Sequence, residues 1–372
     1  MNWPSVALGD ITTKIGSGAT PRGGQKAYKT EGTPLIRSMN VHDGRFVTEG
    51  LAFIDDKQAD ALQNVTLREG DVLLNITGAS VARSCRLPAQ YAGGRVNQHV
   101  AIIRPVRDEI LPEYLEHLLV SPTTKGVLLR IAGGGATREA ITKTAIEELK
   151  IPLPPLEEQM RIAGILDQAA ELCRLRSRAL DKLNTLGQAI FHEMFGSVHA
   201  NPNGYARIPL GKLIKVSSGQ GLTSKAMVPG DFPVYGGNGI NGYHNEGPIG
   251  PGRIVIGRVG VYCGAVHVTE KQCWVTDNAL LVKQLEPCSV TYLSEALKVA
   301  DLNQYAGRAA QPLISGSRIY PVEILLPPEE KQIQFETALN SVASQRSAAQ
   351  FAVEKAKTLF ASLQHRAFRG EL

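Results

Sequence analysis

Mostly apolar residues recur in alternating steps of four and three along two long segments of the chain. This spacing predicts two helices, each with a heptad seam, and the two seams are in the same register at an offset of 173 residues. About 40 residues at 1.5 Å per residue give roughly 60 Å of helix each. The seam positions are Ile162, Leu166, Ala169, Cys173, Arg176, Leu180, Leu183, Gly187, Ile190 and Met194, and then Phe335, Leu339, Val342, Arg346, Ala349, Val353, Ala356, Phe360, Leu363 and Ala367.

The start of each predicted helix is marked by a proline pair, at residues 154–155 and 327–328. Proline suits a helix start, and the glutamates that follow favour the positive end of the helix dipole. A single seam often packs on its own domain. Two matched seams with small residues instead favour packing of the helices against each other, with Arg176 and Arg346 fixing the register.

The segments before the helices contain short apolar runs between Gly, Asn and Pro residues, which predict strands at 72–74, 100–103, 254–256 and 279–282. Helical spacing predicts shorter helices at 112–119 and 290–297. The expected fold class is therefore mixed α+β (α/β). We expect four parts, at residues 1–155, 156–196, 197–328 and 329–372, in which each globular domain is followed by a long helix.

The two halves are also similar in sequence. Leu8-Gly-Asp-Ile11 is echoed by Leu210-Gly-Lys-Leu213, and each is followed by a Ser-Gly pair, at residues 17–18 and 218–219. Residues 71–78 parallel 253–260, and residues 96–98 parallel 276–278. Self-similarity at this scale predicts a duplicated architecture.

Composition and charge narrow the function classes. The chain has 372 residues, and its formal net charge is only +5. The globular parts carry this charge, with 18 basic and 16 acidic residues in 1–155 and 11 and 8 in 196–328. If the protein binds a polyanion, we expect the globular parts to make the contact. We expect a soluble, cytoplasmic protein without a membrane span, and five reduced, mostly buried cysteines.

Common catalytic motifs are missing from the sequence. It has no G-x-x-x-x-G-K-[ST] phosphate loop and no G-x-S-x-G nucleophile elbow. His192-Glu193 lacks the second histidine of a zinc helix, and Asn201-Pro-Asn-Gly204 lacks the stacking aromatic of a methyltransferase pocket. We therefore expect no catalytic residue, no metal site and no cofactor bound by this chain.

A glycine-rich stretch, Tyr235-Gly-Gly-Asn-Gly-Ile-Asn-Gly-Tyr243, predicts either tight turns between strands or a loop that contacts nucleic acid. Arginine and asparagine suit guanine and adenine edges, and a similar mixture lies in the first half. The residues that we expect to contact DNA are Thr20, Arg22, Lys26, Arg37, Ser38, Asn40, Thr77, Arg83, Asn97 and Gln98, and then Lys225, Gly237, Asn238, Asn241, His244, Arg258, Asn278 and Arg308.

Several of these segments carry a family resemblance. They are Val6-x-Leu-Gly-Asp-Ile11, the glycine-rich stretch, Val275-Thr-Asp-Asn-Ala279, both Pro-Pro-x-x-x-Gln helix starts and the ending Leu363-Gln-His-Arg-Ala-Phe-Arg-Gly-Glu-Leu372. Together they resemble the DNA specificity (S) subunits of Type I restriction-modification systems, over essentially the whole chain.

The resemblance implies two target recognition domains, each reading half of a split double-stranded DNA site, separated by two helices that form an antiparallel coiled coil. It also implies two adenine methyltransferase (M) subunits that use S-adenosylmethionine, and restriction (R) subunits that use ATP and Mg. Because the two halves differ at Arg253, Arg258 and Val259, against Asp71, Ile76 and Thr77, we expect a bipartite asymmetric site.

Two other hypotheses compete with the specificity-subunit interpretation. The fold also suits a non-catalytic scaffold or solitary regulator that organises partner proteins without reading DNA. A third reading is the detached recognition part of a single-chain restriction enzyme, although the sequence carries no catalytic domain.

Overall fold

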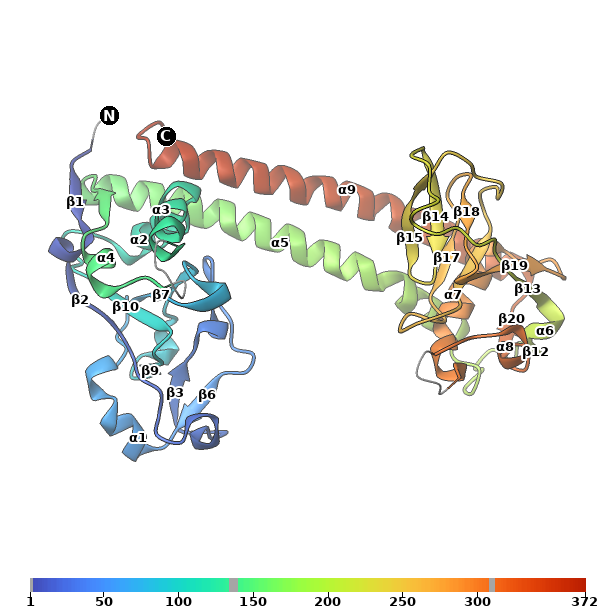
Figure 1. Ribbon diagram of the computed structural model, residues 1–372, viewed down its shortest axis with the longest axis horizontal. Coiled ribbons are helices and arrows are strands. Elements are labelled where there is room, and N and C mark those ends of the chain that lie inside the picture. Colours follow the sequence, from blue (N-terminus) through green and yellow to red (C-terminus); the bar gives the residue numbers. More distant parts are fainter. Residues whose placement is uncertain (1–2, 134–139, 308–311) are drawn as a thin grey trace. The chain divides into compact units, whose positions relative to one another are not determined.

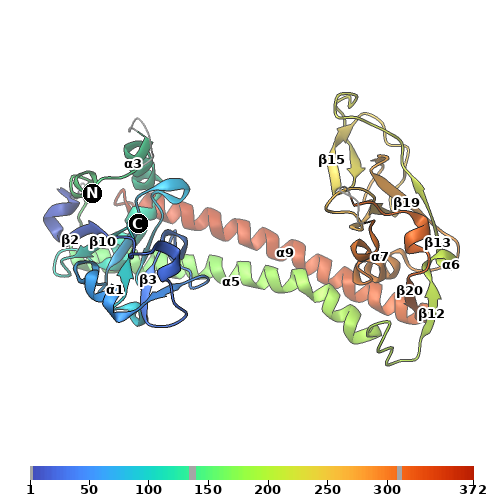
Figure 2. The same cartoon turned by 60° about the horizontal axis from the view of Figure 1, so that its bottom comes forward.

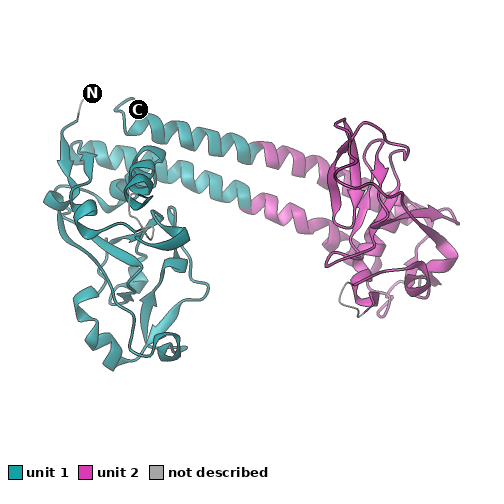
Figure 3. Ribbon diagram, in the orientation of Figure 1, with its two compact units in different colours: residues 1–177, 352–372 teal, residues 178–351 magenta. Residues whose placement is uncertain are grey.

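The computed structural model describes residues 3–133, 140–307 and 312–372. It divides into two compact units, residues 1–177 with 352–372 (unit 1) and residues 178–351 (unit 2) (Figure 3). The two longest helices are α5 (Leu156–Phe195) and α9 (Glu329–Ala367), and each unit contains one end of both. The mixed α/β fold is thus confirmed.

Unit 1 is built on an antiparallel sheet of order β2-β10-β7-β8, with strands Thr12–Ser17, Val100–Pro105, Val72–Asn75 and Ser84–Arg86 (Figure 1). A second sheet has the order β6-β3-β9, with strands Ala52–Ile54, Thr33–Ile36 and Arg95–Val96. Strand β1 (Ser5–Ala7) pairs with β11 (Lys150–Pro152), and β4 (Val41–His42) pairs with β5 (Arg45–Phe46). The shorter helices are α1 (Asp56–Ala61), α2 (Pro112–Val120), α3 (Pro122–Gly133) and α4 (Lys143–Glu147).

Unit 2 repeats this plan. Its main sheet has the order β13-β19-β16-β17, with strands Ile214–Ser218, Ala279–Gln284, Ile254–Gly257 and Val266–Val268. The second sheet is β15-β14-β18, with strands Gly239–His244, Phe232–Gly236 and Trp274–Val275 (Figure 1). Strand β12 (Ala206–Pro209) pairs with β20 (Glu323–Leu326) (Figure 2), and the helices are α6 (Leu210–Leu213), α7 (Val290–Val299) and α8 (Gly316–Ile319). The predicted duplication and strands are confirmed.

The strand registers correct one detail of the predicted repeat. Parallel pairing matches Ile36 with Val96 in unit 1 and Tyr235 with Val275 in unit 2, so Val96 corresponds to Val275. Residues 96–98 therefore parallel 275–277, one position earlier than the sequence alone suggested. The slip arises because side chains alone matched the segments, whereas backbone pairing sets the register.

The apolar runs of the main sheets are buried on both faces. In β7, Val72 and Leu74 enter the core beneath α2 and α3, while Leu73 points to the opposite core, which β3 and β6 cover. Side chains alternate across a strand, so a strand covered on both faces reads as an unbroken apolar run. In unit 2, Ile254 and Ile256 alternate with Val255 in the same way.

The Ser-Gly echo has a steric cause. A Cβ atom on Gly18 would lie 1.6 Å from the carbonyl oxygen of Val96, and one on Gly219 would lie 2.2 Å from that of Val275. Only glycine permits this close approach of two backbones. The repeated glycine therefore marks equivalent contacts in the two units.

Each unit contains an antiparallel pairing of the two long helices. In unit 1, Arg161 of α5 donates to the backbone oxygen of Leu372 (3.0 Å), just beyond the end of α9. In unit 2, a Cβ atom on Gly187 would lie 3.0 Å from the side chain of Leu339, and Phe191 packs on Phe335. The seam positions are buried or half-buried except for two.

The two exceptions are Arg176 and Arg346, which are exposed, so their predicted place in the seam is wrong. In α5 the next half-buried position after Cys173 is Ser177, a step of four rather than three. The arginine side chain is thereby left on the solvent face, where its charge stays hydrated.

The glutamine that follows each proline pair fixes the start of its helix. Gln159 is fully buried, accepts a hydrogen bond from the backbone N–H of Leu111 (2.9 Å) and donates to the carbonyls of Glu109 and Pro154 (both 2.9 Å). Gln332 accepts from the N–H of Ser289 (2.8 Å) and donates to Pro327 (2.8 Å). Each amide therefore ties a long helix to the segment that begins α2 or α7.

Within the described residues, no helix combines the length and the apolar character that crossing a membrane requires.

Candidate nucleic-acid interface

The loop between β7 and β8 brings several predicted contact residues together. Residues 76–83 form a tight loop in which the N–H of Asn75 donates to Arg83 (2.8 Å) and that of Ala82 donates to Asn75 (2.8 Å). Gly78 and Ala82 have φ angles of +73° and +65°. A left-handed alanine is strained, and such strain persists where the surrounding structure enforces it.

A cleft of about 940 Å³ borders this loop, which we call the unit 1 cleft. Its lining comes from the β7–β8 loop, the turn after β3, the residue before β10, and Ala140, which lies three residues before α4. The lining residues are Ser38, Met39, Thr77, Gly78, Ala79, Ser80, Arg83, His99 and Ala140. Three predicted contact residues, Ser38, Thr77 and Arg83, therefore share one cleft.

A chain of polar side chains lies at this cleft. The Thr77 hydroxyl lies 2.5 Å from Nδ1 of His99, and Nε2 of His99 lies 2.8 Å from the side-chain nitrogen of Gln98. The side-chain oxygen of Gln98 is buried and has no hydrogen-bond partner among the described residues. His99 was not predicted, although the predicted Gln98 precedes it directly.

Two of the predicted contact residues in unit 1 are buried, which corrects their assignment. Asn40 is fully buried, accepts from the N–H of Arg37 (3.0 Å) and donates to the carbonyl of Val47 (2.9 Å). Asn97 is 6% exposed, and its side-chain oxygen accepts from the N–H of His99 (3.1 Å). These amides bind the protein's own backbone because buried amides must satisfy their polar atoms. They therefore support the loops.

The remaining predicted residues of unit 1 lie elsewhere. Thr20, Arg22 and Lys26 are exposed on the segment after β2, and none of them lines the unit 1 cleft. Arg37 is half-buried, with its guanidinium 5.0 Å from the ring centroid of Tyr28 and donating to the carbonyl of Gly50. The structure thus places Arg37 in contacts within unit 1.

The loop between β16 and β17, residues 258–265, is the unit 2 counterpart. The N–H of Gly257 donates to Ala265 (2.8 Å) and that of Gly264 donates to Gly257 (2.8 Å), matching the bonds of Asn75 and Ala82. Arg258 donates to the Ser218 hydroxyl (3.1 Å) and to the carbonyl of Asp277 (3.2 Å).

The other predicted contact residues of unit 2 differ in their exposure to solvent. Asn238, Asn241, Asn278 and Lys225 are exposed and Gly237 is half-buried. His244 is 7% exposed, and its Nδ1 accepts a hydrogen bond from the N–H of Val228 (3.0 Å), so the structure removes it from the surface set. The glycine-rich stretch forms the β14–β15 hairpin, which confirms the predicted turn. Arg308 lies outside the described residues.

Two apolar residues at the tip of the β16–β17 loop were missed. Val261 is 81% exposed and Tyr262 is 59% exposed. The repeat could have found them, because the predicted match of residues 71–78 with 253–260 ends just before this tip.

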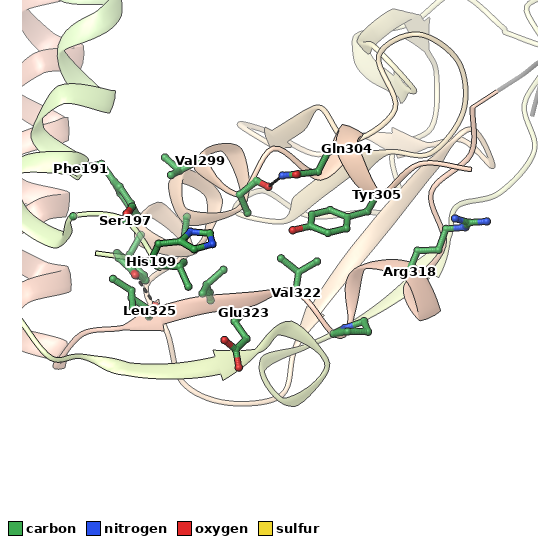
Figure 4. A pocket seen from close by; sticks show the side chains of 17 residues that line it. Phe191, Ser197, His199, Val299, Gln304, Tyr305, Arg318, Val322, Glu323 and Leu325 are labelled. Carbon is green, nitrogen blue, oxygen red and sulfur yellow. Dashed lines mark hydrogen bonds between the residues drawn. The ribbon is translucent and has the colours of Figure 1, made fainter. Parts of the chain in front are cut away.

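Unit 2 has a cavity of about 490 Å³ beside the C-terminal end of α5 (Figure 4). Phe191, Val299 and Val322 contribute apolar surface to it, while His199 and Glu323 contribute polar side chains. None of the predicted DNA-contact residues lines this cavity.

The cysteines are free: Cys85, Cys263 and Cys273 are buried, and Cys173 and Cys288 are half-buried. Burial raises the pKa of Cys273 and of Cys288 to about 11, so these two thiols are protonated at neutral pH. No group of three or more His, Cys, Asp and Glu side chains within the described residues could hold a metal ion.

Known proteins match the chain in sequence. Residues 1–185 match the family model "Type I restriction modification DNA specificity domain". The chain is 29% identical over 148 residues to the Type I restriction enzyme EcoprrI specificity subunit of Escherichia coli, covering 37% of each chain. It is 27% identical over 198 residues to the putative MjaX specificity subunit of Methanocaldococcus jannaschii, covering 52% of this chain and 45% of that protein. The matches thus span less than half of these relatives' length.

Solved structures match over a greater length. One, described as "Structural basis underlying complex assembly and conformational transition of the type I R-M system", has a TM-score of 0.65 at 20% identity, covering 100% of this chain and 98% of the other. The S subunit of a Type I restriction-modification system from M. genitalium has a TM-score of 0.62 at 15% identity, covering 99% and 96%. These likenesses show a shared fold. Residues 1–185 thus belong to the family of Type I restriction-modification DNA specificity domains.

Proposed function

We propose that this protein is the sequence-specific DNA-binding specificity subunit of a Type I restriction-modification complex. Each unit reads one half of a bipartite, asymmetric site in double-stranded DNA. The chain itself carries no catalytic role, and it directs adenine methylation and restriction by its partner subunits in the cytoplasm.

The observation that carries the proposal is one backbone loop built twice with different side chains. The strand registers place Thr77 and His99 of unit 1 at the positions of Val259 and Asn278 in unit 2. A shared frame with different donors and acceptors is what two different half-sites require, because base edges are distinguished by their hydrogen-bond patterns.

The partners follow from the chemistry that the sequence lacks. Two adenine methyltransferase subunits would bind S-adenosylmethionine, and restriction subunits would use ATP and Mg. The matched relatives are named as specificity subunits of Type I restriction enzymes, which supports this division of labour. With a net charge of only +5, the isolated chain should bind DNA weakly and with a strong dependence on salt.

The long helices would set the spacing between the two half-sites. Each runs without a break, α5 for 40 residues and α9 for 39. A helix of fixed length gives a fixed rise, which suits a site whose two read segments flank unread bases.

Adenine methylome sequencing of the source cell, with and without this chain, tests the proposal. Loss of one split motif on deletion, restored by the intact gene, is the expected result. Deletion that leaves every methylated motif in place would contradict it. If the chain captures a methyltransferase but the complex ignores DNA sequence, the scaffold reading replaces it.

A further inference from the structure

The tip of the β16–β17 loop holds two large apolar side chains in solvent. Val261 is 81% exposed and Tyr262 is 59% exposed, and they are adjacent in the sequence. Single exposed apolar residues are common, whereas two consecutive large ones at the tip of a structured loop call for an explanation.

The loop that carries this pair is held from several sides. Cys263, the next residue, is buried. The side-chain nitrogen of Asn303 donates to the carbonyl of Cys263 (2.7 Å), and the N–H of Gly260 donates to that of Pro312 (3.1 Å). The exposed position of the pair is therefore set by the fold.

The same loop exists in unit 1 without the apolar pair. The N–H of Val81 donates to Gly78 (2.9 Å), as that of Cys263 does to Gly260 (3.0 Å). The N–H of Arg83 likewise donates to Ser80 (3.2 Å), as that of Ala265 does to Tyr262 (3.1 Å).

With the two bonds already described, four backbone hydrogen bonds match at a constant offset of 182 residues. Ala79 and Ser80 occupy the tip positions in unit 1. The loop therefore forms without large apolar side chains at its tip, and Val261 and Tyr262 are not needed to build it.

Resting on the proposed function, we propose that Val261 and Tyr262 contact the DNA bases of one half-site through the 5-methyl group of thymine. That methyl group is the apolar feature which base edges present in the major groove. The unit 1 tip, with a methyl and a hydroxyl side chain, offers far less apolar surface. Unit 2 thus reads its half-site partly by apolar contact, and unit 1 reads its own mainly by polar contact.

Thymine-to-uracil exchange tests this directly, because uracil pairs as thymine does but lacks the methyl group. The protein is used as its complex with the methyltransferase subunits, and each thymine of the methylome-defined half-sites is replaced in turn. Burying one methyl group contributes about 0.8 kcal/mol, so one uracil should weaken binding by about fourfold. The variant V261A/Y262S, which carries the unit 1 tip residues, should bind both DNAs equally.

Leu285→Ala is the control, since it removes another exposed apolar side chain of unit 2 that lies outside this loop. It should leave the uracil effect in the unit 2 half-site unchanged. The proposal is overturned if intact complex binds uracil and thymine DNA equally, or if V261A/Y262S weakens binding by the same factor on every sequence, as a wedge between base steps would. An intact complex with no sequence preference would instead overturn the proposed function.

Discussion

Thr77, His99 and Gln98 illustrate how a few side chains in the unit 1 cleft can define a hydrogen-bonding pattern. With the Gln98 amide nitrogen donating to Nε2 of His99, the ring proton lies on Nδ1 and points at the Thr77 oxygen. The Thr77 hydroxyl proton is then directed elsewhere and can be offered to a base acceptor. The histidine thus orients the threonine that faces the cleft.

Replacing this histidine should relax recognition of one base. In His99→Ala, Thr77 loses its partner and rotates freely, so discrimination at one position of one half-site should fall by about tenfold. Methylome sequencing of cells that carry the variant measures this. Asn278→Ala, at the equivalent position of unit 2, should affect only the other half-site. An unchanged motif in His99→Ala would exclude the orienting role.

A second residue-scale feature is the charge cluster around Asp167 in unit 1. Asp167 accepts from Arg86 (2.9 Å) and from His117 (2.8 Å), and Arg86 also pairs with Glu113 and Glu116. Burial raises the pKa of Asp167, but the hydrogen bond from His117 and the charge of Arg86 outweigh it, so the pKa lies below its usual value.

The sign of this shift predicts acid sensitivity. A carboxyl group whose pKa is lower in the folded state stabilises the fold above about pH 4, and that stability is lost as the pH falls through the folded pKa. Asp167→Asn should therefore cost about 1 kcal/mol or less at pH 7, since Asp167 is partly exposed, and less at pH 2 than at pH 7. Urea unfolding at both values checks this. Glu171→Gln, which alters a half-buried carboxylate of the same helix that pairs with Arg174 three residues away, should change little at either pH.

At the scale of elements, the buried glutamines at the helix starts join each long helix to its own unit. Gln159→Leu would leave the Leu111 N–H and two backbone carbonyls without partners. We expect it to lower the free energy of unfolding by about 1–3 kcal/mol. Denaturant titration followed by circular dichroism measures this, with Gln332→Leu as the counterpart in unit 2. An equal loss in Gln168→Leu, which alters an exposed residue of α5, would refute a specific role for the amide.

Much of the element plan could be predicted from sequence, because burial imposes periods that a sequence displays. The strands at 72–74 and 254–256 and the helical seams follow from such periods. Arg176 shows the limit: one step of four in place of three moves a residue out of the seam, and local spacing does not reveal which step occurs. Asn40, Asn97 and His244 show a second limit of prediction from sequence. A polar residue has the same appearance in the sequence whether its side chain contacts DNA or the protein's own backbone.

At the scale of the whole molecule, the proposed spacing role predicts that the length of the two long helices sets the number of unread base pairs between the half-sites. Removing residues 178–184 together with 344–350 deletes one heptad from each helix and keeps both seams in phase. Seven residues correspond to about 10 Å, or about three base pairs of unread spacer. Methylome sequencing should show both half-sites unchanged and the spacer shortened. Removing only one heptad should destroy methylation, and an unchanged spacer after the matched deletion would end the ruler hypothesis.

Unit 1 combines residues from both ends of the sequence, 1–177 and 352–372, and this has a consequence for folding during synthesis. Its core includes Ala367, fully buried, and is lined by Phe360 and Leu363, all from the end of the chain. During synthesis, residues 1–177 therefore emerge from the ribosome well before residues 360–367, which cover part of their apolar surface. Late truncations should harm the N-terminal half as severely as the C-terminal half, so a nascent chain stalled before residue 352 would expose an incomplete core to chaperones and proteases.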